Sequence, residues 1–192
     1  MAGREEILAA ACAIGVREGW KAVTIRAVAL KLGYASPLLY EHFRNKEDLL
    51  TQIAVDALKQ LETKLTEEQA SDRRAAVVNM AKRYWTFMLE HTQLYRLMNG
   101  MDGVPIDKEV VGRSAQSLCK IVAEAVQPML GKSAREGDGQ ILADELWALL
   151  HGMAALCMDR VAPFDLARVT SAVLRMIRGT RMGGSVHWNV GP

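Results

Sequence analysis

The sequence predicts an all-α fold, on two observations. Apolar residues recur at the i, i+3, i+4, i+7 spacing of an amphipathic helix along most of the chain, and no stretch alternates as a half-buried strand does. Breaks in the pattern coincide with short runs rich in Gly, Pro and Asp, such as DGVPID at 102–107. With 192 residues, half of them hydrophobic, the chain is long enough to bury one small and one larger core.

The first informative element covers residues 24–33. Ile25, Val28, Ala29 and Leu32 fall on one face of a short helix. Thr24 precedes it and is a good N-cap residue, because its hydroxyl can accept a hydrogen bond from a free backbone N–H of the first turn. Gly33 tolerates positive φ, so the helix is expected to end there in a sharp turn.

A second short helix is expected after this turn. Pro37 fits the first turn of a helix, where no intrahelical N–H partner is lost. Leu39 and Phe43 are i, i+4 partners that can anchor to the core, which leaves Ser36, Pro37, Tyr40 and part of Leu38 on a different face. Two short helices around a glycine turn, with such a face exposed, are typical of a helix-turn-helix unit that reads DNA.

A third helix is expected to begin after Asn45, a plausible N-cap, with Glu47 and Asp48 where the helix dipole favours negative charge. Its free N–H groups and Lys46 form a natural cradle for a phosphate. Thr24, Tyr40 and His42 can add further contacts to the DNA backbone. Contacts of this kind fix the register of a protein on DNA without reading its sequence.

Residues 4 to 50 resemble the DNA-binding domain of the tetracycline-repressor (TetR) family of bacterial transcriptional regulators. The resemblance rests on six segments in the family's order and spacing: an apolar helix Ile7 to Val16, the turn Glu18-Gly19-Trp20, Thr24-Ile25-Arg26, Lys31-Leu32-Gly33, Leu39-Tyr40-Glu41-His42-Phe43, and Asn45-Lys46-Glu47-Asp48-Leu49-Leu50.

The resemblance implies that Arg26, Ser36, Pro37, Leu38 and Tyr40 approach base edges, and that Thr24, Tyr40, His42 and Lys46 mainly hold phosphates. Two positions depart from the family pattern. Ala35 stands where a capping Ser is common, so Ser36 is expected to take over the cap one residue later. Leu38 stands where Thr is common, which replaces a hydrogen bond by apolar contact, for instance with a thymine methyl.

The chain beyond residue 50 is expected to remain helical. Ile53, Ala57 and Leu61 continue the third helix as a connector. Body segments are predicted at 72–98, 106–130, 139–160 and 164–179. The expected domains are therefore a helix-turn-helix DNA-binding domain at 1–50, a helical ligand-binding and dimerisation domain at 51–180, and a flexible tail at 181–192.

The segment from Leu146 to Leu156 resembles a Trp…His-Gly variant of the ligand-binding half of the same family. We expect an apolar pocket between segments 72–98, 106–130 and 139–160, lined by Trp85, Met88, Trp147 and His151. An ordinary helical core, with His151 hydrogen-bonded to a neighbouring helix, is the alternative. Gly152 in mid-helix suggests close approach of another backbone.

The resemblance further implies that the last two helices pair with those of a second copy in a four-helix bundle. Their apolar stripes exceed what one helix pair needs, although both stripes can instead serve the core of one chain. The first stripe comprises Leu146, Leu149, Leu150, Met153, Leu156 and Cys157, and the second comprises Leu166, Val169, Val173, Met176 and Ile177.

Several classes of function are disfavoured. The sequence has no phosphate loop, dinucleotide fingerprint, HExxH or GxSxG motif, so neither an enzyme nor a cofactor or metal site is expected. The apolar run Leu8 to Val16 is too short to span a membrane, and we expect a soluble cytoplasmic protein. Cys12, Cys119 and Cys157 lack metal-finger spacing, and we expect small buried hydrophobes in preference to a thiol sensor.

The formal net charge of +2 indicates modest non-specific affinity for DNA, so tight binding requires two subunits on one site. We expect a homodimeric repressor that binds a double-stranded, pseudo-palindromic operator and leaves it when a small apolar effector binds. One alternative is an activator or nucleoid-type DNA-binding module controlled by a protein partner, without a small-molecule pocket. Another is a helical enzyme or lipid carrier that retains the N-terminal unit.

Overall fold

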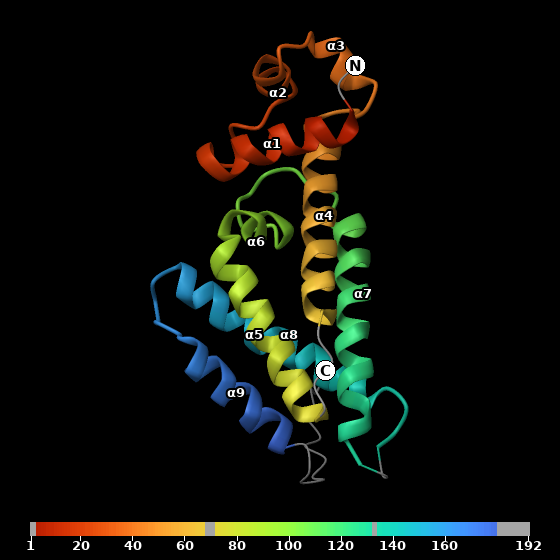
Figure 1. Ribbon diagram of the computed structural model, residues 1–192, viewed down its shortest axis with the longest axis vertical. Helices are drawn as coiled ribbons and strands as arrows, with labels where there is room; N and C mark the ends of the chain where they lie inside the picture. Colours follow the sequence, from red (N-terminus) through yellow and green to blue (C-terminus); the bar gives the residue numbers. More distant parts are fainter. Residues whose placement is uncertain (1–2, 68–71, 132–133, 180–192) are drawn as a thin grey trace, which may run out of the picture. The chain divides into compact units, whose positions relative to one another are not determined.

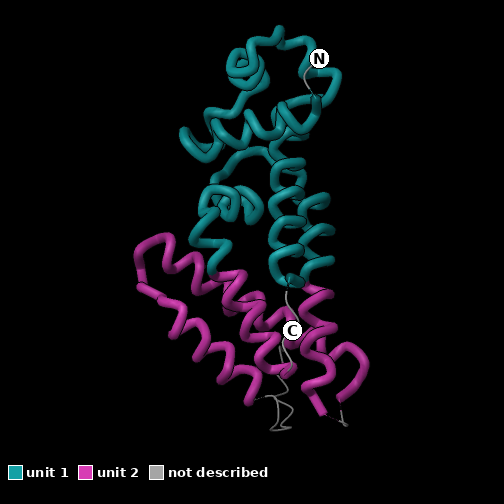
Figure 2. Tube along the Cα trace, in the orientation of Figure 1, with its two compact units in different colours: residues 1–67, 86–118 teal, residues 68–85, 119–192 magenta. Residues whose placement is uncertain are grey.

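The structure, a computed structural model, describes residues 3–67, 72–131 and 134–179, and every regular element in these ranges is helical (Figure 1). The expected tail at 181–192 lies outside the described residues. The all-α prediction is confirmed. The chain divides into two compact units, one of residues 1–67 and 86–118 and the other of residues 68–85 and 119–192 (Figure 2).

The first unit begins with four helices that the sequence predicts closely. They are α1 (Arg4–Glu18), α2 (Ile25–Leu32), α3 (Ser36–Tyr40) and α4 (Lys46–Thr66). Helix α1 contacts both α2 and α4, and α2 contacts α3. Fully buried side chains from all four helices, among them Ile7, Val28, Leu39 and Leu50, form the core of this part.

Trp20 fixes how α1 packs. Its indole is 1% exposed and donates from Nε1 to the carbonyl of Gln93 in α6 (Thr92–Met98), 2.9 Å away. A Cβ atom at Gly15 would lie 2.2 Å from the Trp20 ring, so only glycine fits there. The glycine of α1 is therefore explained by close packing within this unit.

The first unit also contains the end of α5 (Arg73–Glu90) and the beginning of α7 (Lys108–Val126). The predicted segment 72–98 consists of two helices, because α5 ends at Glu90 and α6 begins at Thr92. The backbone of His91 leaves the helical region, with φ −124° and ψ 42°. Its ring lies 4.8 Å from that of Phe87, and its carbonyl accepts from the Tyr95 N–H, so the apolar pattern continues through the bend.

The second unit contains the rest of α5 and α7, a 3₁₀ turn at Gln127–Met129, α8 (Asp138–Met158) and α9 (Leu166–Gly179). Helix α8 starts against the 3₁₀ turn, where the Gly139 N–H donates to Gln127 Oε1 at 2.7 Å. Val169, Val173 and Ile177 of α9 are buried at spacings of four residues. The core of the unit also includes Trp85, Leu142 and Ala154.

Helix α8 is unusually apolar for its length. Among the described residues it is the one helix long and apolar enough, by length and composition, to cross a bilayer, which the sequence analysis did not anticipate. Only 33% of its apolar window is buried within this chain. Core helices of soluble proteins meet the same criterion of length and composition. The finding used below is that the rest of this chain buries only part of the apolar surface of α8.

Candidate DNA-reading surface and effector unit

Thr24 starts α2 as the sequence predicts. Its backbone is extended, with φ −135° and ψ 155°, and its Oγ1 accepts from the Ala27 N–H at 3.0 Å. Ile25, Val28 and Ala29 are buried, whereas Arg26 and Thr24 are exposed. The capping bond therefore fixes the first turn of α2 and leaves Arg26 on the open side of the helix.

Gly33 ends α2 in the left-handed region, with φ 72° and ψ 25°. A residue with a Cβ atom is disfavoured there, and the resulting turn brings α3 against α2. Ser36 is the first residue of α3, and the extended cap position belongs to Ala35, which offers no side-chain acceptor. The expectation that Ser36 takes over the cap is therefore wrong.

Helix α3 is anchored by one face and open on the other. Leu39 is fully buried and Phe43 is 1% exposed, as predicted, although Phe43 lies in the turn after α3 instead of inside it. Tyr40 is 55% exposed and Pro37 is exposed, while Ser36, Leu38 and His42 are half-buried. A short rigid helix with such an open face is able to enter the major groove of DNA.

The start of α4 lies directly after this helix. The Asn45 Oδ1 accepts from the Asp48 N–H at 2.9 Å, which confirms the predicted cap. The Lys46 ammonium donates to the carbonyl of Lys21 at 2.9 Å, and partial burial lowers the pKa of Lys46. One of its three donors thus holds the loop before α2, and the others are available to an anion.

Two further contacts involve cations near this surface. The guanidinium of Arg4 lies over the Phe43 ring, 5.2 Å from its centroid, although the two residues are far apart in the chain. Arg44, the cation next to Phe43 in sequence, is paired instead with Asp48 through its backbone N–H at 3.0 Å and its Nε at 3.5 Å. Of these two cations, Arg44 is engaged by a carboxylate and Arg4 by an aromatic ring.

The four residues proposed to line an effector pocket occupy different positions. Trp85 is 1% exposed and Met88 is 1% exposed, while Trp147 and His151 are half-buried on α8. The Trp147 ring contacts Tyr84 edge-on, with centroids 5.7 Å apart. The Trp85 Nε1 is buried without a hydrogen-bond partner among the described residues, and burial lowers the pKa of His151.

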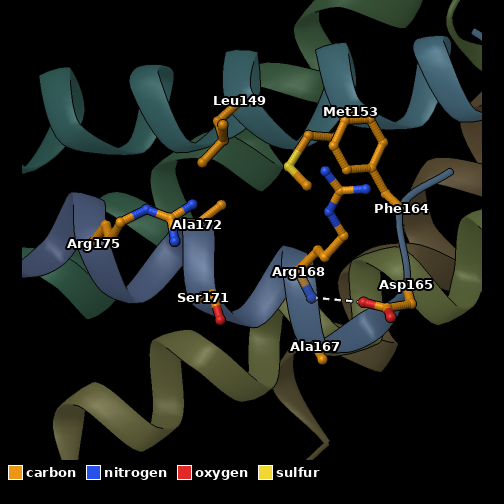
Figure 3. Close-up of a pocket in the computed structure, with 9 residues that line it drawn as sticks. All are labelled: Leu149, Met153, Phe164, Asp165, Ala167, Arg168, Ser171, Ala172 and Arg175. Carbon is orange, nitrogen blue, oxygen red and sulfur yellow. Dashed lines mark hydrogen bonds between the residues drawn. The ribbon is translucent and has the colours of Figure 1, made fainter. Parts of the chain in front are cut away.

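A separate groove of about 580 Å³ lies between α8 and α9 (Figure 3). None of the four proposed effector residues lines it. The Arg168 guanidinium stacks on Phe164 at 5.1 Å and donates to the Pro163 carbonyl at 2.7 Å, which fixes one end of the groove. Its walls are mostly apolar, with two arginines, and comprise Leu149, Met153, Phe164, Asp165, Ala167, Arg168, Ser171, Ala172 and Arg175.

Gly152 faces the open side of α8. A Cβ atom built there meets nothing within 4 Å among the described residues, so the close backbone approach expected from the sequence does not occur within the chain. The predicted apolar stripes of α8 and α9 are partly buried. Leu146, Leu150 and Met153 are covered, whereas Leu156 and Leu166 are each 42% exposed.

The cysteines and acidic groups show no reactive centre in the described part of the chain. Burial raises the pKa of Cys12, and burial together with the nearby Asp144 charge raises that of Cys119. A raised pKa favours the unreactive thiol over the thiolate. Within the described ranges, no group of three His, Cys, Asp or Glu side chains is arranged to hold a metal ion.

Two protein-family models match most of the chain. Residues 7–53 match the model for bacterial regulatory proteins of the tetR family, and residues 77–178 match the tetracyclin repressor-like C-terminal domain. An uncharacterised HTH-type transcriptional regulator of Mycobacterium tuberculosis, Rv0681, is 30% identical over 180 residues, which cover 92% of this chain and 80% of that protein.

Solved structures share the fold. A protein of unknown function from Rhodococcus sp. RHA1 superposes with a TM-score of 0.78 at 24% identity, covering 93% of this chain and 96% of the other. The fatty acid degradation regulator FadR from Bacillus halodurans superposes with a TM-score of 0.71 at 16% identity, covering 95% and 97%. At these identities the likeness concerns the fold alone.

Proposed function

Because this chain belongs to the tetR family of bacterial regulatory proteins, we propose that it is a cytoplasmic, homodimeric repressor that a small apolar effector releases from a pseudo-palindromic operator. Members of this family are DNA-binding transcriptional regulators and are typically not enzymes. The observation that carries the proposal is helix α3, which buries Leu39 and leaves Tyr40 exposed beside it.

In this proposal α3 reads bases and its flanks hold phosphates. Ser36, Pro37, Leu38 and Tyr40 meet base edges, together with Arg26 from α2. Thr24, Tyr40, His42 and Lys46 hold the DNA backbone. The structure supports this division because none of these eight side chains is buried, while the residues between them anchor the helices. Leu38 favours a thymine methyl over a hydrogen-bonding base edge.

Selection of bound duplexes from a random pool tests this division. Ser36→Ala and Arg26→Ala are expected to relax the preference at particular base pairs, since base contacts specify sequence. Lys46→Ala is expected to weaken binding to all duplexes and to lower the salt dependence by about 0.9 in log–log slope per subunit. Unchanged selection and unchanged slopes for all three variants would contradict the site assignment.

We further propose that a second copy covers the open face of α8 and the groove beside α9. The supporting observations are an apolar helix only 33% buried in its window, the empty space at Gly152, and the exposed Leu156 on the same helix. Apolar side chains of a twin helix would fill this space, and the symmetric pair would set the distance between two reading helices.

Sedimentation velocity at micromolar concentration tests the dimer. Leu156→Glu is expected to shift the chain towards monomer by tenfold or more in dimer affinity, because a charge would be buried in the interface. Leu89→Glu, at an exposed leucine of α5, is the matched control and should leave the dimer unchanged. A wild-type chain that sediments as a strict monomer would contradict the dimer.

The proposed effector contacts Trp85, Met88, Trp147 and His151. Two observations support a ligand at these residues. The Trp85 Nε1 is a buried donor with no partner in the described part of the chain, and a buried donor left unpaired costs free energy that an acceptor oxygen on a ligand would recover. The edge contact of Tyr84 and Trp147 supplies apolar ring surface nearby on α5 and α8.

Release requires that the effector bind one geometry of the dimer more tightly than another, since equal affinity for both would shift nothing. Operator release by a panel of apolar compounds tests this step. Acyl compounds belong in the panel because FadR of Bacillus halodurans, a protein of the same fold, is named for fatty acid degradation. An effector should raise the melting temperature and release the operator, and Trp85→Phe should weaken both effects. If only a protein partner releases the operator, the result would favour the alternative, a DNA-binding module that is controlled by a protein and has no small-molecule pocket.

A further inference from the structure

We infer that Arg4 is an additional DNA-contacting residue, which donates to a backbone phosphate beside the reading helix. The inference rests on the proposed orientation of α3 towards DNA. Nothing in the residues around Arg4 indicates this role, because the contact that positions its guanidinium comes from Phe43, on a different element.

The guanidinium of Arg4 has a rigid support. Its Cζ lies 5.2 Å from the centroid of the Phe43 ring, within cation–π range. Phe43 is 1% exposed, and its backbone N–H donates to the Leu39 carbonyl at 3.0 Å, so the ring itself is fixed. A planar guanidinium stacked on a ring keeps its N–H donors at its edge, where they can meet phosphate oxygens.

The support places Arg4 at the proposed DNA surface. Phe43 lies in the turn between α3 and α4, three residues after Tyr40 and three before Lys46. Helix α1 begins beside this turn (Figure 1). The guanidinium therefore lies over a ring of the turn that leads into α4, whose start carries the proposed phosphate ligand Lys46. In this inference Arg4 adds a second cation to the favourable field that a helix N-terminus offers an anion.

Neighbouring charges leave Arg4 available. Among the described residues, Arg44 is bound to Asp48 and Arg17 to Glu18, whereas Arg4 lies over the Phe43 ring. Glu5 and Glu6 follow it in α1, but successive residues project about 100° apart around a helix axis. Within the residues that the structure describes, no ion pair joins either carboxylate to Arg4.

Salt titration of duplex binding tests the inference. Arg4→Met keeps the length of the side chain and removes its charge. With a mixed-sequence duplex of about 24 base pairs, long enough for two half-sites one turn apart, the magnitude of the log–log salt slope should fall by about 0.9 per subunit. If the variant and the wild type bind equally at 1 M salt, this difference in slope makes the variant bind about eightfold more weakly per subunit at 0.1 M salt. Arg17→Met, at the other end of α1, should leave the slope unchanged.

The outcomes separate the inference from the function on which it rests. A wild-type chain that binds the duplex with a salt-dependent slope, together with an Arg4→Met variant of the same slope, would overturn the role of Arg4. A wild-type chain without affinity for duplex DNA would instead overturn the proposed orientation of α3, and the inference with it.

A double-mutant cycle tests the positioning by Phe43. Phe43→Leu keeps an apolar side chain in the core but removes the ring. The effect of Arg4→Met on affinity should be at least threefold smaller in that background, and Arg4→Lys should keep the slope while losing part of the affinity. Circular dichroism melts verify that each variant is folded. An equal effect of Arg4→Met in both backgrounds would show that the ring does not position the guanidinium.

Discussion

The α2–α4 region and the α8–α9 pair differ in how their structure is encoded. In the former, the decisive interactions join residues three or four apart, such as Thr24 to Ala27 and Asn45 to Asp48. In α8 and α9, helix positions follow from sequence, but the covered face depends on what packs against it. Leu146 is buried and Leu156 is 42% exposed within one predicted stripe. A helix cap depends on residues three or four apart in the chain, whereas the burial of a side chain depends on which other elements pack against it.

Two mid-helix glycines illustrate the same difference. Both Gly15 and Gly152 interrupt apolar helices, and each costs about 1 kcal/mol relative to alanine in helix propensity. Gly15 is required by the Trp20 ring, 2.2 Å from where a Cβ would lie, whereas Gly152 faces open space in its own chain. The need for a glycine inside a helix is thus set by what packs against it: the Trp20 ring, five residues along the chain, folds back onto Gly15, whereas a Cβ at Gly152 meets nothing within 4 Å among the described residues.

The largest expected effect is that of Gly15→Ala. The added methyl would overlap the Trp20 ring, which is buried and held by its bond to Gln93, so α1 or the ring must move. We expect a loss of about 2 kcal/mol in the free energy of unfolding, in the range of other overpacked cores. Urea denaturation measures it. Gly112→Ala in α7, where a Cβ meets nothing within 4 Å, should instead be neutral or stabilising.

Tyr40→Ala separates a role in DNA binding from a role in the stability of the fold. The side chain is 55% exposed, so its loss should leave the melting temperature nearly unchanged. Operator affinity should fall by about tenfold to a hundredfold, or 1–3 kcal/mol, because Tyr40 is proposed to contact both base and phosphate. Fluorescence anisotropy measures the affinity. Lys120→Ala, at an exposed position of α7, is the control, and an equal loss there would remove the special role of Tyr40.

Two substitutions at helix N-caps are expected to change the free energy of unfolding by similar amounts in opposite directions. Thr24→Ala removes the acceptor for the Ala27 N–H and should cost about 1 kcal/mol. Ala35→Ser should add an acceptor at a position that already has the extended backbone of an N-cap, and stabilise by up to about 1 kcal/mol. Thermal and urea unfolding of both variants measure these changes. Destabilisation by Ala35→Ser would show that the α2–α3 turn cannot accommodate a hydroxyl.

The smallest effect expected is a pH dependence from His151. Burial lowers its pKa below the ordinary value of about 6.5, so at pH between the two values the unfolded chain binds more protons than the folded chain. Stability should therefore fall as the pH decreases through 6.5 towards the folded pKa, and level off below it. Melting curves from pH 7.5 to 5 for the wild type and His151→Gln measure this contribution, which the variant should lack.

The sequence predicted the fold class, the bounds of α2 and the start of α4, because those features depend on nearby residues. It missed the bend at His91, since the apolar period continues from α5 into α6 while the backbone does not. It also misassigned the cap of α3 to Ser36. Arg4 escaped notice because the 5.2 Å contact with Phe43 joins residues far apart in the chain.

The amino-acid sequence by itself determined that this chain is helical, where α2 and α4 begin, and to which family it belongs, because capping, turn chemistry and apolar spacing act over a few residues. The tertiary structure decided that the Arg4 guanidinium lies over the Phe43 ring, that the Trp20 indole donates to the Gln93 carbonyl, and how much of α8 its own chain covers. Those outcomes depend on distances between residues remote in the chain, which only the folded packing fixes.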